Sequence, residues 1–254
     1  MSFQVAAEAY DRFMGRWSRP LAAELVRLVD PQQGQRVLDV GCGPGALTGA
    51  LVSRLGVGGV VAVDPQPGFV ETIRERFPGV EVHHGTAEAL PFDDDTFDAV
   101  LAQLVVHFMA DPVAGLREMA RVARPGGLVA ASVWDHGRGP GPLTAFWEGV
   151  RTIDPGNEGE ANLRGAREGE LLELARAAGL ADPRQEVLTV HLTFDSFEEW
   201  WEPFALGVGP AGGYVARLDA AGLVALRRAC RERLPEPPFQ LPARAWCVIA
   251  VADG

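Results

Sequence analysis

The sequence predicts an α/β protein whose core is a doubly wound, mostly parallel sheet. Short apolar runs rich in Val and Leu alternate along the chain with amphipathic stretches of helical period, an arrangement typical of such sheets. A turn with three glycines, at Gly41, Gly43 and Gly45, follows the first clear apolar run. The chain has 254 residues, 47% of them apolar, which is enough for a sizeable core. We therefore expect a single domain over residues 1–254.

The composition excludes several functional classes. All 23 basic residues are Arg, so the chain has no lysine for Schiff-base chemistry or for a phosphate-binding Walker motif. The formal charge of −11 disfavours nucleic acid as a partner, because a polyanion would be repelled. A small neutral or cationic molecule is the expected partner.

The cysteines and the N-terminal residues indicate a location. Three cysteines, an odd number without metal-type spacing, favour a reducing compartment and no disulfide framework. No targeting pattern opens the sequence and no apolar run reaches membrane length, so we expect a cytoplasmic protein that does not bind membranes. His83 and His84 are adjacent but lack a third ligand at a suitable spacing, and we expect no metal site.

The first strand and the glycine turn organise the rest of the chain. An apolar run at 37–40 reads as a buried strand, and the turn after it leads into a helix. Asp39 stands two residues before the turn, and Asp64 closes the next apolar run, at 60–63. A carboxylate at the end of a second strand is placed to accept both hydroxyl protons of a ribose. We assign Asp39, Gly41, Gly43, Asp64 and Pro65 to a cofactor site.

Two cofactors fit this turn. Gly41, Gly43 and Ala46 satisfy the dinucleotide spacing G-x-G-x-x-G/A, which would suit NAD. The ionised carboxylate of Asp39 would repel a pyrophosphate but would suit a ligand that carries an ammonium and a sulfonium. S-adenosylmethionine is therefore the expected cofactor.

Residues 37–45 resemble the first motif of class I S-adenosylmethionine-dependent methyltransferases, in the branch that includes the ubiquinone/menaquinone-type enzymes. Stretches at 62–64, 85–92 and 121–127 are similar to that family in the same order. The resemblance implies a Rossmann-like sheet of seven strands, the last one antiparallel, and transfer of a methyl group to an O, N or C atom of a small molecule. Beyond Trp134 the resemblance is thin.

The N-terminal segment, 1–34, reads as two helices. The first covers 5–14, and Ser18 caps a second that ends before Gly34. The resemblance implies that this segment lies across the cofactor, where Tyr10 would bond the methionine carboxylate and Arg16 would pair with it. The alternative is that the aromatic residues here only pack the helices together.

The rest of the cofactor-binding core, 35–134, carries three more candidates. A strand at 80–84 leads to a turn that brackets the adenine in this family, with Thr86 and the backbone N–H of Ala87 as the implied contacts. Many relatives have Asp in place of Thr86. Gln103 ends the next strand, 97–102, where open α/β sheets contact ligands. His107 follows as the candidate general base, since an unperturbed imidazole titrates near neutrality; packing, or contact with the cofactor, is the alternative.

The C-terminal half departs from strict alternation. After a helix at 112–123 and a strand at 128–134, residues 135–167 read as an irregular stretch with one helical turn around Phe146, and as a possible substrate lid. The remaining segment, 168–254, combines elements of several kinds. They are expected as a helix at 168–178, a strand at 186–194, a helical insertion over 195–235 with a flexible loop at 207–213, and a last strand at 245–251. The insertion would roof an apolar acceptor pocket, with a structural cap or a dimer face as alternatives.

Three functions remain at this point. Methyl transfer from S-adenosylmethionine to a small molecule leads. A protein that binds S-adenosylmethionine or S-adenosylhomocysteine without transferring methyl is the second. An NAD-dependent oxidoreductase is the third, and it lacks the Tyr-x-x-x-Lys pair of the short-chain class. The sequence leaves open whether the protein is a monomer or a homodimer.

Overall fold

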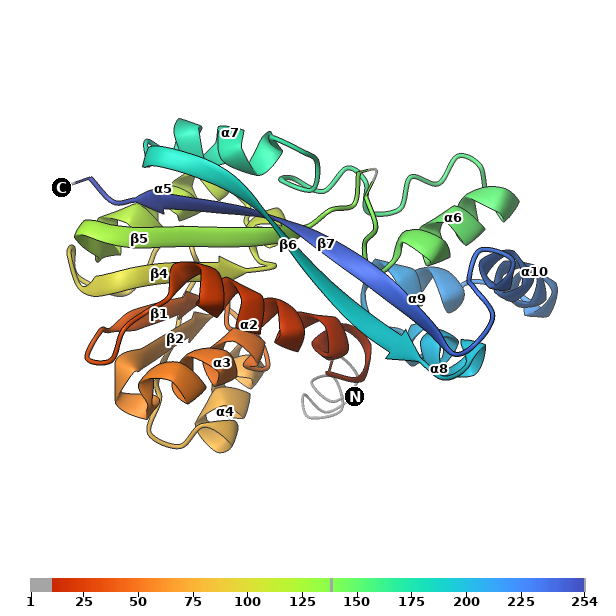
Figure 1. Ribbon diagram of the computed structural model, residues 1–254, viewed down its shortest axis with the longest axis horizontal. Coiled ribbons are helices and arrows are strands. Elements are labelled where there is room, and N and C mark those ends of the chain that lie inside the picture. The colour runs from red at the N-terminus through yellow and green to blue at the C-terminus, as the bar shows by residue number, and fades with distance from the viewer. Residues whose placement is uncertain (1–10, 138, 254) are drawn as a thin grey trace.

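A single seven-stranded sheet runs through the protein (Figure 1). The computed structural model describes residues 11–137 and 139–253. The strand order is β3-β2-β1-β4-β5-β7-β6. Neighbours among β1–β5 are parallel, and β7 is antiparallel to both β5 and β6. This confirms the predicted doubly wound sheet with an antiparallel last strand. The strands are β1 (Val37–Val40), β2 (Val60–Asp64), β3 (Glu81–His84), β4 (Phe97–Gln103), β5 (Ala123–Trp134), β6 (Ala181–Phe194) and β7 (Phe239–Val251).

Helices cover both faces of the sheet because its central strands are apolar on both sides. One face carries α2 (Arg16–Val29), α3 (Ala46–Leu55) and α4 (Pro67–Arg76), and the other carries α5 (Pro112–Val122) and α7 (Glu170–Ala177) (Figure 1). Two separate clusters of buried apolar side chains follow, one on each face. The carboxyl ends of the parallel strands stay free of these helices, which leaves that edge of the sheet available for a site.

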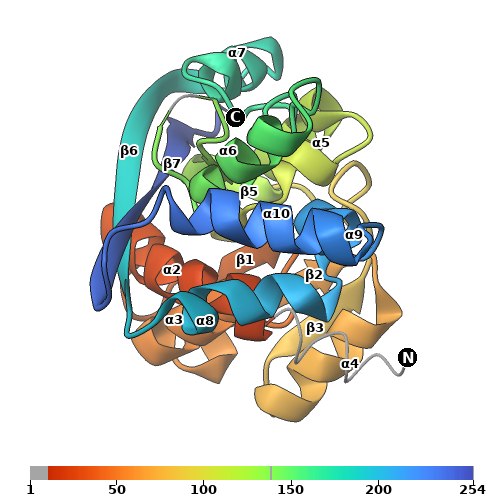
Figure 2. The ribbon, with the colours of Figure 1, turned by 90° about the vertical axis from the view of Figure 1, so that its right-hand side faces the viewer.

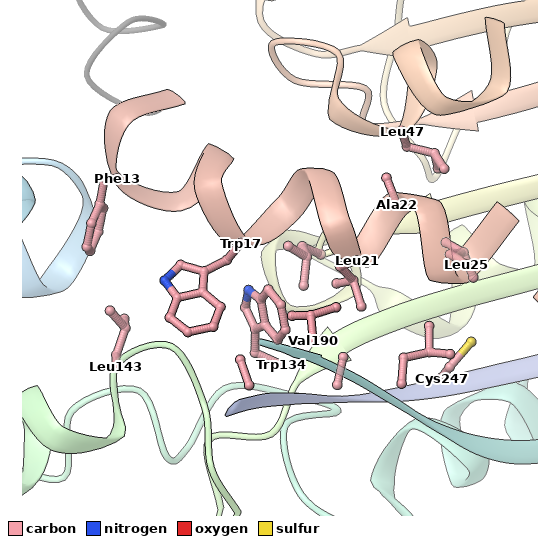
Figure 3. Close-up of a cluster of buried hydrophobic side chains, with 14 of the residues drawn as sticks. Phe13, Trp17, Leu21, Ala22, Leu25, Leu47, Trp134, Leu143, Val190 and Cys247 are labelled. Carbon is pink, nitrogen blue, oxygen red and sulfur yellow. The ribbon is translucent and has the colours of Figure 1, made fainter. Parts of the chain in front are cut away.

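Helix α2 begins differently from the prediction. A π-helical turn, η1 (Asp11–Gly15), runs directly into it, so Ser18 lies inside the helix and is not its N-cap. The Ser18 hydroxyl instead donates to the carbonyl of Met14 at 2.9 Å. Figure 3 shows the apolar side of α2, with Trp17 and Leu21 directed at Trp134 of β5. The helix is therefore anchored on the strands that lead to the C-terminal helices.

A group of short helices stands at the carboxyl edge of the sheet (Figures 1 and 2). Its members are α6 (Thr144–Ile153), α8 (Phe197–Trp201), η4 (Glu202–Leu206), α9 (Gly209–Val215) and α10 (Ala220–Arg231). Most of them are inserted between β6 and β7, as the sequence predicts. We call this group the cap.

The cap corrects two expectations. Helix α6 is ten residues long, where a single turn was expected. Packing against α10 stabilises it: the two helices are so close that a Cβ on Gly149 would lie 2.6 Å from the Cys230 sulfur. The expected loop at 207–213 is wrong as well, since Gly209–Val215 is a helix. The packing of Tyr214 against Trp147, with ring centroids 6.3 Å apart, holds this glycine-rich segment in helical form.

The aromatic residues of the insertion fill the interior of the cap. Trp200, Trp201 and Phe204 are at most 3% exposed, and Phe204 stacks on Phe146 with ring centroids 4.5 Å apart. They line neither of the two cavities described below. These three side chains therefore pack the cap itself and do not roof either cavity. Within the described residues no helix combines the length and the apolar character that crossing a bilayer requires.

Candidate cofactor site

The glycine turn after β1 brings the backbone close to its surroundings. Gly41 has a φ of +68°, and a Cβ there would lie 2.6 Å from the Val105 side chain. Gly43 has a φ of +51°, and a Cβ there would meet nothing within 4 Å. Only glycine adopts the backbone conformation and the close approach at position 41 without strain. At Gly43 the bare backbone faces open space, which is the predicted cradle for a ligand.

Asp64, at the end of β2, joins the turn to the segment that follows β2. Its carboxylate accepts the N–H of Gly43 at 2.9 Å and the N–H of Gln66 at 2.8 Å. Burial raises the pKa of this carboxyl, while the two backbone N–H groups act in the opposite direction. Each carboxylate oxygen keeps a lone pair for another donor, so Asp64 is free to bind hydroxyl groups as well as to support the turn.

Asp39 is deeper in the structure, with an exposed fraction of 1%. The Thr48 hydroxyl, from the first turn of α3, donates to its carboxylate at 2.6 Å. Burial raises the pKa of Asp39 to about 7, opposed by the Thr48 hydrogen bond and assisted by the charge of Asp64. The carboxylate was expected to be fully ionised, whereas here it is poised between its two forms near neutral pH. A bound cation would favour the ionised form.

Gln103, at the end of β4, presents a polar atom without a partner. Its Nε2 donates to the Ser18 carbonyl of α2 at 3.0 Å, and its buried Oε1 has no partner among the described residues. A buried acceptor without a donor costs free energy unless a ligand or water satisfies it. This orphaned oxygen is the clearest sign that the site is built for a group with N–H or O–H donors.

These side chains meet in one cavity of about 370 Å³ at the carboxyl ends of β1, β2 and β4. Six predicted site residues line it: Asp39, Gly41, Gly43, Asp64, Pro65 and Gln103. None of the described lining residues is Arg or His. A cationic, hydrogen-bond-donating ligand therefore fits the charge of the cavity, and S-adenosylmethionine is of this kind.

Two other predicted cofactor contacts, Thr86 and Ala87, are not among the residues that line this cavity. Thr86 is exposed in the turn after β3, and the side chain of Ala87 is buried in the core beside α5. Tyr10 lies outside the described residues. Their assignment to the cofactor stays a prediction. Arg16 pairs with Glu199 of the cap at 2.7 Å and lies over the Phe194 ring, so the structure engages it away from the site.

Two aromatic residues that were not predicted from the sequence line the cavity. Phe69 comes from the first turn of α4, and Phe108 follows β4 in a short 3-10 turn, η3 (Val106–Phe108). Phe108 is 74% exposed, which is unusual for a large apolar side chain. The signal in the sequence was the place of each residue shortly after a strand, at the edge where ligands bind.

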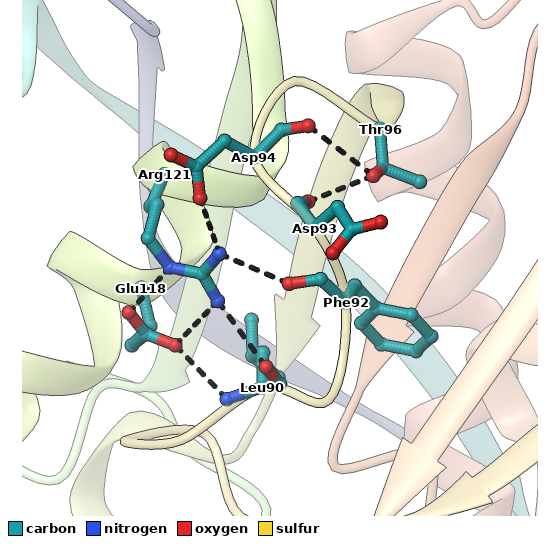
Figure 4. Close-up of polar contacts among 7 residues, drawn as sticks. All are labelled: Leu90, Phe92, Asp93, Asp94, Thr96, Glu118 and Arg121. Atoms are coloured by element: carbon teal, nitrogen blue, oxygen red, sulfur yellow. Dashed lines mark hydrogen bonds and ion pairs between the residues drawn. The ribbon is translucent and has the colours of Figure 1, made fainter.

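The loop that follows the Thr86 turn is clamped by Arg121 of α5 (Figure 4). The guanidinium donates to the carbonyls of Leu90 and Phe92 and pairs with Asp94 and Glu118. Glu118 in turn accepts the N–H of Leu90 at 3.0 Å. The stretch at 121–127, one of those that carry the family resemblance, thus begins with a residue that holds the loop after the Thr86 turn in place.

His107 sits in η3, beside the cavity but not among its lining residues. Burial lowers its pKa to about 3, assisted by the charge of His136, which follows β5. Its Nδ1 is buried without a partner in the described part of the chain, and its ring packs on Phe108 with centroids 4.0 Å apart. The premise that this imidazole titrates near neutrality is therefore wrong, and a group with this pKa is a weak base.

The fold and the site define an open α/β protein with a nucleotide-type cofactor cavity at the carboxyl edge of its sheet. Residues 38–131 match a family model described as a methyltransferase domain. This part of the chain, which carries the cofactor cavity, is therefore similar to methyltransferase domains.

Named relatives and a solved structure agree with this assignment. An uncharacterized methyltransferase of Mycobacterium tuberculosis is 43% identical over 135 residues, which cover 53% of this chain and 52% of the relative. A demethylmenaquinone methyltransferase of Clavibacter sepedonicus is 41% identical over 106 residues, covering 41% of this chain and 42% of the relative. The chain thus spans about half the length of these curated relatives. The solved structure of phosphoethanolamine N-methyltransferase 2 of Haemonchus contortus matches in fold, with a TM-score of 0.59 and 19% identity over 98% of this chain and 57% of that one.

Proposed function

We propose that this protein transfers the methyl group of S-adenosylmethionine to a small-molecule acceptor. The observation that carries the proposal is the cavity within the methyltransferase domain, where two carboxylates and an unpartnered amide oxygen face a bare glycine turn. Bound S-adenosylmethionine would supply a methyl group on a sulfonium, which is already reactive. The task of the protein is then to align the acceptor and to exclude water.

Each wall of the cavity suits one part of this cofactor. The Asp64 carboxylate would accept the ribose hydroxyls, and Asp39 together with the Gln103 Oε1 would receive the ammonium group. Phe69 offers an apolar surface to the adenosyl part. Thr86, Ala87 and Tyr10 remain proposed contacts on the strength of the family resemblance.

The same charges disfavour the nicotinamide alternative. A dinucleotide would place a pyrophosphate beside Asp39 and Asp64, and no cationic side chain among the described residues lines the cavity to offset the repulsion. An NAD-dependent oxidoreductase is therefore not the function that this site supports.

Titration calorimetry with S-adenosylmethionine, S-adenosylhomocysteine and NAD tests the cofactor. We expect binding of the first two and none of NAD; micromolar binding of NAD alone would overturn the proposal. Methyl transfer is then measured by mass spectrometry against small phenols, amines and carboxylic acids. A protein that binds S-adenosylmethionine but methylates no member of a broad acceptor panel would instead be the non-transferring binder.

A further inference from the structure

A second cavity lies at the carboxyl edge of the sheet, between the turn after β5, helix α6 and the segment that leads to α7. Its volume is about 270 Å³. A chain of contacts leads to it from the cofactor cavity. Phe108 lines the cofactor cavity and packs on His107, and His107 lies close enough to His136 for their charges to interact. His136 lines the second cavity.

Glu160 is the feature of this cavity that points to a ligand. One carboxylate oxygen accepts the Trp147 indole N–H at 2.9 Å, and the other has no partner within the described residues. The side chain is partly buried, and burial raises the pKa of its carboxyl. A shielded carboxylate without a counter-ion is costly, and a cation that enters the cavity would relieve that cost.

Among the residues that the structure describes, the cationic side chains that line this cavity are not the counter-ion of Glu160. Arg167 lines the same cavity, but it donates to the Ala161 carbonyl and to the Asn162 side chain. Arg151 also lines the cavity and is exposed to solvent, so water screens its charge. Neither one contributes to the environment that sets the Glu160 pKa.

A second, independent observation comes from His136. Its imidazole lines the cavity and makes no hydrogen bond with any of the described residues. Its pKa is lowered to about 4, chiefly by burial, so the ring is neutral near pH 7. A neutral imidazole both accepts and donates one hydrogen bond. The cavity thus offers an anionic contact at Glu160 and an uncharged polar contact on the side of the cofactor site.

We propose that the second cavity holds the methyl acceptor and that this acceptor carries an amino group, which Glu160 binds as an ammonium ion. The contact between this ammonium group and the Glu160 carboxylate would hold the acceptor in the cavity. The inference rests on the proposed methyl transfer, because only that function gives the cavity an acceptor to hold. It adds the chemical class of that acceptor.

The test uses three probes of similar shape and different charge: 2-phenylethylamine, 2-phenylethanol and 3-phenylpropionate. Each is titrated by calorimetry into the full chain at pH 7.5, with S-adenosylhomocysteine present at saturation. We expect the amine to bind at least about tenfold more tightly than the alcohol, as for a charged hydrogen-bond partner, and the acid not to bind. Equal binding of amine and alcohol, or preference for the acid, would overturn the proposal.

Two variants locate the binding. In Glu160→Gln the side-chain oxygen still accepts the Trp147 N–H, so the fold is retained while the charge is lost; we expect amine affinity to fall about tenfold or more. Glu168→Gln removes an exposed carboxylate that does not line the cavity and is the matched control, with a change of less than about twofold.

The outcomes separate the two proposals. Unchanged amine affinity in Glu160→Gln rejects the acceptor class. Loss of S-adenosylhomocysteine binding in the unaltered chain rejects the proposed function instead. If either variant melts early, the comparison of the three probes on the unaltered chain still decides the question.

Discussion

The carboxylate of Asp64 accepts the backbone N–H of Gly43 at 2.9 Å and so ties the end of β2 to the glycine turn that follows β1. This bond joins the two features that the sequence places 21 residues apart. Asp64 therefore supports the shape of the turn, and its remaining lone pairs are the ones that the proposed ribose contact would use. The first prediction follows from this double role.

Replacement of Asp64 by Ala should weaken S-adenosylmethionine binding by on the order of 2 kcal/mol, because a charged hydrogen-bond partner is lost. Calorimetric titration measures the dissociation constant. Glu71→Ala, which removes a carboxylate from an exposed pair on α4, is the control for loss of charge. Unchanged affinity in Asp64→Ala would show that the ribose is bound elsewhere.

Replacement of Asp39 by Asn should stabilise the empty protein at pH 8 and weaken cofactor binding. The folded-state pKa of about 7 exceeds the ordinary value of 3.8, so this group favours folding at low pH, and that contribution is lost as the pH rises from about 4 to about 7. Asn removes the cost of a buried charge above pH 7, on the order of a few kcal/mol. Chemical denaturation at pH 5 and pH 8 measures the free energy of unfolding. A stabilisation by Asn that is equal at both pH values would contradict the raised pKa of Asp39.

Replacement of Gly41 by Ala should disturb the cofactor turn beyond the cost of its backbone conformation. The new Cβ would lie 2.6 Å from the Val105 side chain. Gly34→Ala is the matched control, with a φ of +88° and nothing within 4 Å, and it should cost about 1–2 kcal/mol. Gly41→Ala should exceed that by about 1 kcal/mol or more, and Val105→Ala should recover part of the excess. Equal melting temperatures for the two alanine variants would argue against the contact.

Replacement of Arg121 by Gln should loosen the loop at 88–96 more than the fold as a whole. It removes the donors to Leu90 and Phe92, two carbonyls that water then solvates, so the free energy of unfolding should fall by only about 1 kcal/mol. Hydrogen exchange should become faster at 88–96, while Arg74→Gln on α4, a surface pair, should leave that loop unchanged. Unaltered exchange in the loop would mean that Arg121 does not hold it.

Replacement of His107 by Gln should make the protein less sensitive to acid. The folded-state pKa of about 3 lies below the ordinary value of 6.5, so the unfolded chain binds a proton that the folded chain refuses, and stability falls as the pH drops below 6.5. We compare the free energy of unfolding of the variant with that of the unaltered protein at two pH values. Relative to the unaltered protein, the variant should be more stable at pH 5 than at pH 7.5 by about 1–2 kcal/mol. His191→Gln, at an exposed position on β6, is the control. If His107 acted as a base, its loss would lower turnover without changing cofactor affinity.

Much of the lining of the candidate cofactor cavity could be predicted from the sequence. Asp39, Gly41 and Asp64 lie in or next to strands whose apolar residues make them recognisable, and the carboxyl ends of parallel strands meet at one edge. Gln103 was found by the same rule. Each depends on a local pattern and on a general property of open sheets, so no knowledge of distant contacts was needed.

The form of the C-terminal half and the protonation of the titratable groups depend on contacts between distant parts of the chain. The helix at 209–215 forms against its local composition because Tyr214 packs on α6. Arg16 meets Glu199, a residue 183 positions away, and His107 owes its low pKa to burial and to His136. The Glu160 carboxylate accepts the indole N–H of Trp147, a residue of helix α6. These outcomes depend on which surfaces come into contact when the chain folds. The burial of a residue and the charges around it are set by those tertiary contacts and not by the neighbouring sequence.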